Sequence, residues 1–333
     1  MKLTIAIPTY NRNEILYKNI EKLLPQITDE CRVIIFDNYS DVPVKDTIED
    51  LVEANSHIDI SIVRNRYNIG MTANILKCFE KCPDPWLWVL GDDDEVTDGA
   101  VARILSDIDM KREMHFITYA WDADSFKRGQ EVITTGIDPF LDTFETFGAV
   151  LFLSTSVYNM EKVIGSMSFA QFFQTSYAPH LVMLFMSLGD DGKCAFSTDQ
   201  IVVNKAEETP AHLKWDQIFI YQLTMLLRLP LKPSTIAKLR NRLEQLTRVW
   251  TIYHFIFTLT FKEYEEGSIN KPTILYGEVV RSFFHLDRRI STRLVSRLGY
   301  FIVKYPFLFK WILARMFKAL KGTQFEPDKN LRI

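Results

Sequence analysis

The chain has 333 residues, of which 47% are hydrophobic, and its formal net charge is −3; it can form one large domain or two, and nucleic acid is not expected as a partner. The N-terminal apolar run is too short for a secretory signal and no stretch reaches about 18 uncharged apolar residues, so we expect a cytoplasmic protein without a transmembrane helix. The four cysteines form no CxxC pair, which indicates structural thiols rather than disulfides or a zinc site.

The N-terminal third of the chain alternates short apolar runs with helical patterns. Strands are predicted at residues 3–7, 32–36 and 58–63, and a buried fourth strand at residues 86–90. Apolar residues recur at helical spacing between these strands, for example over residues 71–81. This alternation predicts an α/β fold with a parallel sheet and right-handed crossovers. Ligands bind beyond the carboxyl ends of such strands, and polar residues follow all four.

The fourth strand leads directly into an acidic sequence. Asp92, Asp93 and Asp94 follow Gly91, and Glu95 comes next. Adjacent carboxylates repel one another, and a hard divalent cation such as Mg²⁺ or Mn²⁺, which also binds phosphates, would relieve that repulsion. A solvated acidic turn is the alternative. Since the chain has no GxGxxG or GxxxxGK[ST] sequence, a metal at the aspartates could hold a diphosphate in place of a glycine loop.

Four pieces of the sequence together resemble the family 2 glycosyltransferases, which have the GT-A fold. The pieces are residues 5–12, residues 37–41, the segment 68–74 with Asn68, Gly70 and Asn74, and residues 91–94 as the family's DxD element. The resemblance implies a Rossmann-like catalytic domain, a mostly parallel sheet flanked by helices. It also implies inverting transfer of a sugar from a nucleotide-diphosphate donor, with Mn²⁺ or Mg²⁺ as cofactor.

The resemblance assigns roles to the residues that match its first two pieces. Pro8, Thr9, Tyr10 and Arg12 would form the wall around the nucleotide. Asp37 would face the base or the ribose, where a carboxylate accepts hydrogen bonds from N–H or hydroxyl groups. For Asp37 the alternative is a turn-forming role after a strand.

The later pieces leave two questions open. Asn68 and Gly70 would also bind the nucleotide, although Asn-x-Gly is a common turn and helix-start sequence. Asp92 and Asp94 satisfy DxD literally, while alignment on the preceding leucine places the metal-binding acid at Asp93. All three aspartates are candidate metal ligands, with Asp93 and Asp94 favoured, and Asp94 is also a catalytic candidate through contact with the donor.

An inverting transferase needs a general base, because the attacking hydroxyl must lose its proton. The resembling family commonly has a Glu-Asp pair there, but residues 174–182 contain no carboxylate. His180 can accept a proton near neutral pH, at the start of a helix over residues 181–188, and a packing histidine is the alternative. Asp191, in a Gly-Asp-Asp-Gly turn typical of solvated acids, is another catalytic candidate. The remaining acids considered are Asp122, Asp124 and Asp190.

Beyond residue 203 the chain becomes polar and then helical in pattern, so we expect a catalytic domain at residues 1–210 and a helical region at 211–333. His212 lies where a loop of the resembling family closes over the donor, and is a candidate metal or diphosphate contact; a plain linker is the alternative. Residues 281–321 contain ten Lys or Arg and one acid, interleaved with aromatic residues. That pattern suits an anionic membrane surface, here the cytoplasmic face of the inner membrane; an oligomer interface or helical core is the alternative.

The expected function is transfer of a sugar to a hydroxyl of a growing polysaccharide or lipid-linked glycan, of the capsule, O-antigen or lipopolysaccharide type. Nucleotidyltransferases are a second class, but they generally carry a glycine-rich basic loop that residues 8–13 lack. A non-catalytic glycan-binding or scaffold protein on a glycosyltransferase fold is a third. The missing Glu-Asp pair favours that class, and the three intact aspartates oppose it.

Overall fold

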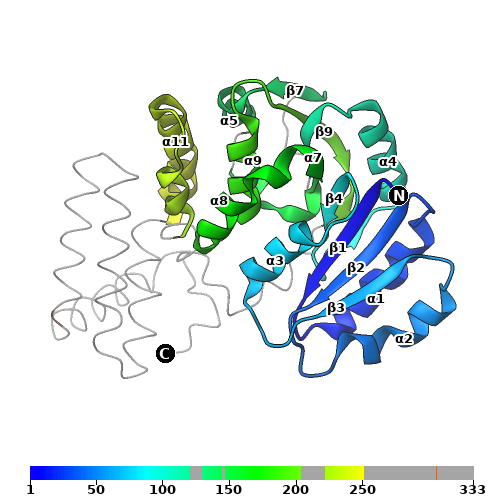
Figure 1. The fold of residues 1–333 in the computed structure, drawn as a ribbon. Helices are drawn as coiled ribbons and strands as arrows, with labels where there is room; N and C mark the ends of the chain where they lie inside the picture. The colour runs from blue at the N-terminus through cyan, green and yellow to red at the C-terminus, as the bar shows by residue number, and fades with distance from the viewer. Residues whose placement is uncertain (121–129, 145–146, 204–221, 251–304, 306–333) are drawn as a thin grey trace, which may run out of the picture. The chain divides into compact units, whose positions relative to one another are not determined.

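The computed structural model describes residues 1–120, 130–144, 147–203, 222–250 and Tyr305 (Figure 1). The chain divides into two compact units, Met1–Leu213 with Met225–Arg242, and Lys214–Thr224 with Leu243–Ile333. The sheet and the candidate site both belong to the first unit.

Within the described residues, the main sheet has eight strands in the order β3-β2-β1-β4-β8-β6-β9-β7. The strands are β1 (Leu3–Thr9), β2 (Cys31–Asp37), β3 (Ile60–Arg64), β4 (Trp86–Val89), β6 (Met114–Ala120), β7 (Val132–Thr135), β8 (Ser156–Asn159) and β9 (Lys193–Gln200). Six of them run in one direction, whereas β7 and β8 are antiparallel to their neighbours. A separate two-stranded ribbon pairs β5 (Glu95–Val96) with β10 (Val202–Val203). The predicted fold class, a mostly parallel α/β sheet, is confirmed.

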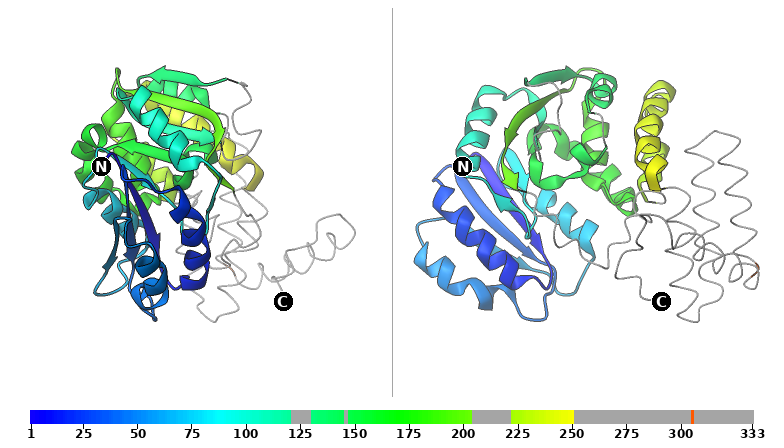
Figure 2. Two further views of the ribbon diagram at one scale, coloured as in Figure 1. Left: turned by 90° about the vertical axis from the view of Figure 1, so that its right-hand side faces the viewer. Right: turned by 180° about the vertical axis from the view of Figure 1, so that it is seen from behind.

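Helices cover both faces of this sheet, as the views in Figures 1 and 2 show. One face carries α1 (Asn13–Leu23), α2 (Val44–Ala54) and α4 (Ala100–Met110), and the other carries α3 (Met71–Glu80), α7 (Met160–Val163), α8 (Met167–Phe172) and α9 (Pro179–Leu188). The remaining described α-helices are α5 (Ile137–Thr143), α6 (Gly148–Leu151) and α11 (Pro233–Trp250). None of the helices in the described part of the chain is long and apolar enough to cross a membrane.

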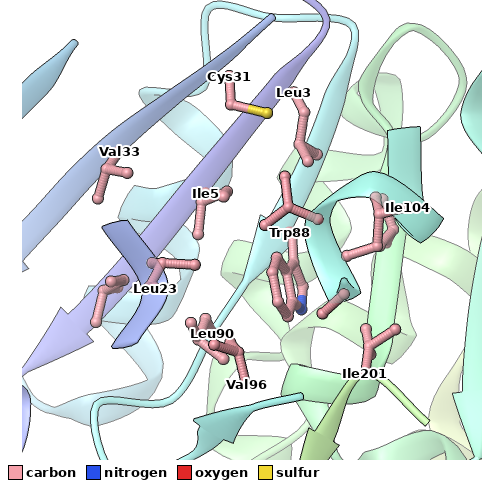
Figure 3. Close-up of a cluster of buried hydrophobic side chains, with 14 of the residues drawn as sticks. Leu3, Ile5, Leu23, Cys31, Val33, Trp88, Leu90, Val96, Ile104 and Ile201 are labelled. Carbon is pink, nitrogen blue, oxygen red and sulfur yellow. The ribbon is translucent and has the colours of Figure 1, made fainter. Parts of the chain in front are cut away.

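The core between the sheet and the helices α1, α2 and α4 is built from alternate side chains of the strands, which point to that face. Leu3 and Ile5 of β1, Trp88 of β4, Leu23 of α1 and Ile104 of α4 lie in one buried cluster (Figure 3). All four residues of β4 are buried, because helices cover both faces of the sheet there. Burying a large apolar side chain contributes about 1.5–3 kcal/mol each. The predicted buried fourth strand is therefore confirmed.

The part of α11 in the first unit packs against α5. Thr235 Oγ1 donates a hydrogen bond to Asp138, and Arg242 Nε donates to the Leu141 carbonyl at 2.7 Å. The first unit thus continues past the polar segment that begins at residue 204. The division predicted at residue 210 stays a prediction.

The strand directions decide at which edge of the sheet a functional site can form. Because β1, β2, β3 and β4 are parallel, the loops that follow them meet at one edge of the sheet, here called the carboxyl edge. β8 runs the other way, so the residues just before it, including Ser154, also lie at the carboxyl edge. Residues that precede a parallel strand lie at the opposite edge.

Candidate functional site

The acidic turn, residues 91–95, is fixed to the loop that follows β1. Thr9 Oγ1 donates to Asp92 Oδ2 at 2.7 Å, and Arg12 Nη1 donates to Asp92 Oδ1 at 2.9 Å. Asn19 of α1 donates its side-chain N–H to the Asp92 carbonyl at 2.8 Å. Asp92 is 6% exposed, so these bonds compensate a buried carboxylate that would otherwise be costly. The structure thus brings the predicted residues Thr9, Arg12 and Asp92 together.

Arg12 joins two of the three aspartates. The same Nη1 atom that binds Asp92 lies 2.7 Å from Asp93 Oδ2, whose side chain is 43% exposed. Arg12 immediately precedes α1, so its backbone is positioned by the start of that helix. One guanidinium nitrogen therefore sits between two carboxylates at the carboxyl edge.

Asp94 is held by a different partner. Ser154 Oγ donates to Asp94 Oδ2 and accepts from the Gly91 N–H at 2.8 Å. The Ser154 carbonyl in turn accepts from Trp88 Nε1 at 2.7 Å. A Cβ atom at Gly91 would lie 2.4 Å from Asp94 Oδ2, which explains the glycine at the start of the turn. Sequence reasoning missed Ser154, because nothing in the sequence around it signals contact with a turn 60 residues earlier.

The electrostatics of the turn follow from burial. Burial raises the pKa of Asp92 to about 6, against the opposing effects of Arg12 and Thr9. Burial also raises the pKa of Asp94 to about 7; the hydrogen bond from Ser154 opposes this, and the charges of Asp93 and Asp92 add to it. The metal-free turn can therefore hold a proton near neutral pH, so its three aspartates together carry less than three full negative charges.

The acidic turn can supply only a small number of ligands to a divalent ion. No group of three or more His, Cys, Asp or Glu side chains converges as a metal site within the described residues. Asp92 and Asp93 nevertheless face a common point, occupied by Arg12 Nη1. Mg²⁺ and similar ions often bind through one or two carboxylates and substrate phosphates, so these two acids fit such a site. His212 lies outside the described residues.

Asp37 is fully buried, and protein groups surround its carboxylate. Its Oδ1 accepts from the Ser40 N–H at 2.8 Å, and its Oδ2 accepts from the Val44 N–H at 3.3 Å and pairs with Arg64. The Arg64 guanidinium carbon lies 5.0 Å from the centre of the Tyr39 ring, which is about half exposed. The structure thus places Asp37 in the turn-forming arrangement. A contact from Asp37 to a base or ribose stays a prediction.

An asparagine network organises the loop after β3. Asn65 donates to the side-chain oxygens of Asn38 and Asn74, and Asn38 donates to Asn68 at 2.8 Å. Asn68 also accepts from the N–H of Gly70, which has φ of 84° and precedes α3. Sequence reasoning singled out Asn68, Gly70 and Asn74 but not their connection to Asn38 and Asn65. Their observed contacts fix the turn and the helix start.

The two remaining nucleotide-wall candidates also lie at the carboxyl edge. Pro8 is part of β1 and pairs with Phe36 of β2. Tyr10 follows β1 and is 42% exposed. Its exposure leaves the ring available to a ligand, and its contact with a nucleotide stays a prediction.

His180 does not have the properties expected of the general base. It lies in the first turn of α9, is 2% exposed, and neither ring nitrogen has a hydrogen-bond partner among the described residues. Burial lowers its pKa to about 3, whereas the predicted role needs a value near 6 to 7. The expectation that Pro179 begins a helix is confirmed. The surroundings of His180 match the packing alternative rather than the base role.

The structure places Asp191 away from the acidic turn, and its catalytic role stays a prediction. Asp190 and Asp191 are exposed in the turn before β9, and Lys232 pairs with Asp190. Because β9 is parallel to β6 and shares the direction of β1, this turn lies at the edge of the sheet opposite the acidic turn. The sequence correctly indicated solvated loop acids there. Asp122 and Asp124 lie outside the described residues.

Tyr177 precedes α9 in an unusual backbone conformation that the sequence did not reveal. It links the 3₁₀ turn η4 (Gln174–Ser176) to α9, with φ of 66°, a left-handed conformation unusual for a bulky residue. Its hydroxyl donates to Met71 Sδ at 3.6 Å. Burial raises its pKa to about 12, and the positive charge of Arg12 acts in the opposite direction. The segment before α9 thus contacts the start of α3 through this tyrosine.

Known proteins are similar to part of the sequence and to the fold. Residues 4–154 match the family model Glycosyl transferase family 2. This family 2 segment contains the loop after β1, the whole acidic turn and Ser154. All the contacts of the three aspartates described above therefore lie within it.

Two curated relatives are similar over part of the chain. One is the GalNAc(5)-diNAcBac-PP-undecaprenol beta-1,3-glucosyltransferase of Campylobacter jejuni, 26% identical over 31% of this chain and 33% of that protein. The other is an uncharacterized glycosyltransferase of Haemophilus influenzae, 26% identical over 41% of this chain and 45% of that protein. The matches thus span less than half the length of these relatives.

A solved structure extends the similarity of fold over most of the chain. The S. aureus TarS 1-349 structure in complex with UDP-GlcNAc has a TM-score of 0.64 and 12% identity, covering 91% of this chain and 90% of that chain. At this level of identity the likeness supports the GT-A type of fold.

Proposed function

We propose that the protein transfers a sugar from a nucleotide-diphosphate donor to a hydroxyl of a growing polysaccharide or lipid-linked glycan, with inversion and with a divalent metal. The observation that carries the proposal is the acidic turn of the family 2 segment, held at the carboxyl edge by Thr9, Arg12 and Ser154. Donors of this kind are supported by the structural neighbour with bound UDP-GlcNAc. A lipid-linked glycan acceptor is supported by the name of the Campylobacter relative; the capsule, O-antigen or lipopolysaccharide type is part of the proposal.

In this proposal, the residues of the carboxyl edge bind and orient the donor. Asp92 and Asp93 would hold Mn²⁺ or Mg²⁺, which would neutralise charge on the diphosphate as the leaving group departs. Tyr10, half exposed beside Arg12, would border the nucleotide, and Arg12 would offer a planar fork of N–H donors to phosphate oxygens. The acceptor hydroxyl would attack the anomeric carbon of the sugar as the bond to the nucleotide diphosphate breaks, and its proton would pass to a general base.

The test combines donor screening with a matched pair of variants. Nucleotide-sugars are screened by thermal shift with and without Mn²⁺, since a ligand that binds the folded state raises its melting temperature. The donor that binds is then used in a transfer assay. Asp93→Asn should abolish transfer and metal-dependent donor binding while the melting temperature is kept, because Asp93 is half exposed.

Asp191→Asn is the control, since it removes one carboxylate at the opposite edge and should leave transfer unchanged. Wild-type turnover of Asp93→Asn, or full wild-type activity in excess EDTA, would contradict the metal assignment. Donor binding without transfer to any acceptor would instead favour the non-catalytic glycan-binding alternative.

Association with an anionic membrane surface is a separate part of the proposal. It rests on the basic and aromatic composition of residues 281–321, of which the structure describes Tyr305 alone. Each basic residue near an anionic surface contributes about 1 kcal/mol. Removing residues 300–333 should therefore release the protein from anionic vesicles in sedimentation assays, and unchanged binding after truncation would refute the idea.

A further inference from the structure

One charged group at the acidic turn occupies the position that a metal bound by Asp92 and Asp93 would need. Arg12 Nη1 lies 2.9 Å from Asp92 Oδ1 and 2.7 Å from Asp93 Oδ2. These are the two carboxylates best placed to bind a divalent ion, and the guanidinium nitrogen stands at the point they share. An ion that takes both carboxylates must displace this nitrogen.

We propose that Arg12 is a built-in counter-cation that exchanges with the metal. In the free protein it neutralises Asp92 and Asp93; when a divalent ion binds both, the guanidinium is released and is taken up by the diphosphate of the donor. The second step rests on the proposed function, whereas the first concerns only metal and protein.

The surroundings of Arg12 suit such an exchange. Its side chain is 26% exposed and that of Asp93 is 43% exposed, so the guanidinium can leave towards solvent without unpacking the core. Asp92 keeps its bond from Thr9 Oγ1 when Arg12 leaves, and Asn19 still holds its carbonyl. The turn therefore retains its position while its cation changes.

The exchange predicts opposite effects of one substitution on two ligands. Arg12→Gln should tighten binding of Mn²⁺ alone by about tenfold, because hydrogen bonds to charged groups contribute on that scale and no longer compete. The same variant should bind Mg²⁺-pyrophosphate several-fold more weakly than the wild type, because the released guanidinium is missing. Arg12→Lys keeps a competing cation and should bind Mn²⁺ about as weakly as the wild type.

Mn²⁺ binding is measured by electron paramagnetic resonance of the free ion, and Mg²⁺-pyrophosphate binding by calorimetry, both without donor or acceptor. Arg112→Gln is the matched control, since Arg112 is 77% exposed and pairs only at the surface with Asp109; it should change neither affinity. Thermal melting establishes that each variant is folded.

A direct measurement on the wild type completes the test. In spectra of ¹⁵N-labelled arginine side chains, the signal missing from Arg12→Gln should shift when Mg²⁺ is added. The proposed exchange would be overturned if Arg12→Gln bound Mn²⁺ no more tightly than the wild type. It would also be overturned if Mg²⁺ left the Arg12 signal unchanged. Neither measurement depends on sugar transfer, so the exchange can be established or refuted even if the proposed function fails.

Discussion

Replacing Asp94 by asparagine should stabilise the protein, and the gain should depend on pH. Asparagine keeps an oxygen that can accept from Ser154 Oγ, which holds the native carboxyl. It removes the buried charge, because burial raises the Asp94 pKa from 3.8 to about 7. We consider the metal-free protein, with EDTA present throughout.

The size and the pH window follow from linkage. A pKa that rises from 3.8 to about 7 corresponds to about 4 kcal/mol at about 1.4 kcal/mol per pKa unit. Between those values the folded chain keeps a proton that the unfolded chain releases, so wild-type stability falls as the pH rises towards 7. Asparagine lacks this penalty. The advantage of Asp94→Asn should thus be smallest near pH 4.5 and reach about 2–4 kcal/mol at pH 8.

Urea denaturation at several pH values measures the free energy of unfolding directly. Asp84→Asn is the matched control: Asp84 is 7% exposed and accepts from Thr4 and from Arg32, each at 2.7 Å. Weakening these bonds should lower the free energy of unfolding by about 1–3 kcal/mol. Asp84→Asn should therefore destabilise the protein, whereas Asp94→Asn should stabilise it. An Asp94→Asn protein that is no more stable at pH 8, or equally shifted at pH 4.5 and pH 8, would refute the reasoning.

Three further substitutions test the packing of the fold by chemical denaturation. Gly136→Ala should lower stability by about 2 kcal/mol or more, since glycine there has φ of 83° and a Cβ would lie 2.6 Å from the Asp190 carbonyl oxygen; an unchanged midpoint would contradict the clash. Asn74→Ala should lower the free energy of unfolding by about 1–3 kcal/mol, because it leaves the buried Asn65 amide and a β2 carbonyl without their bonds to Asn74. The double variant Asn74→Ala, Asn65→Ala should lose less stability than the two single variants added together. Asp37→Ala should lower stability by about 2–4 kcal/mol, because it removes two backbone contacts and an ion pair from a buried carboxylate; a purely nucleotide-facing aspartate would leave the unfolding free energy unchanged.

The sequence predicted the parallel half of the sheet because its signals there are local. The residues 86–90 are large, apolar and bounded by Pro85 and Gly91, and β4 forms among them. β8 gave no such signal, since Ser156–Asn159 is too short and too polar for a pattern, and pairing between β4 and β6 decides its state. The periodicity of an isolated segment cannot reveal which long-range partner completes a strand.

The site was predictable to a similar degree and for the same reason. Thr9, Arg12 and the aspartates follow adjacent parallel strands, so their meeting could be inferred from topology. Ser154 reaches the site from the loop before an antiparallel strand, a connection that carries no local signature. His180 was assigned from its chemistry alone, whereas its burial depends on how α9 packs, which the sequence does not reveal.

The position of β8 has a consequence for anyone producing parts of this protein. The family 2 segment ends at residue 154, whereas the strand that pairs with Trp86, Leu87 and Trp88 begins at Ser156. A fragment cut at that boundary would leave an apolar strand with unpaired backbone groups, the arrangement that promotes aggregation. During synthesis on the ribosome, β4 is complete at Val89 and β8 only at Asn159. At about 5–20 residues per second, β4 therefore waits roughly 4–14 s for β8. Chaperone binding to nascent chains should therefore peak in that interval and end once β8 has emerged.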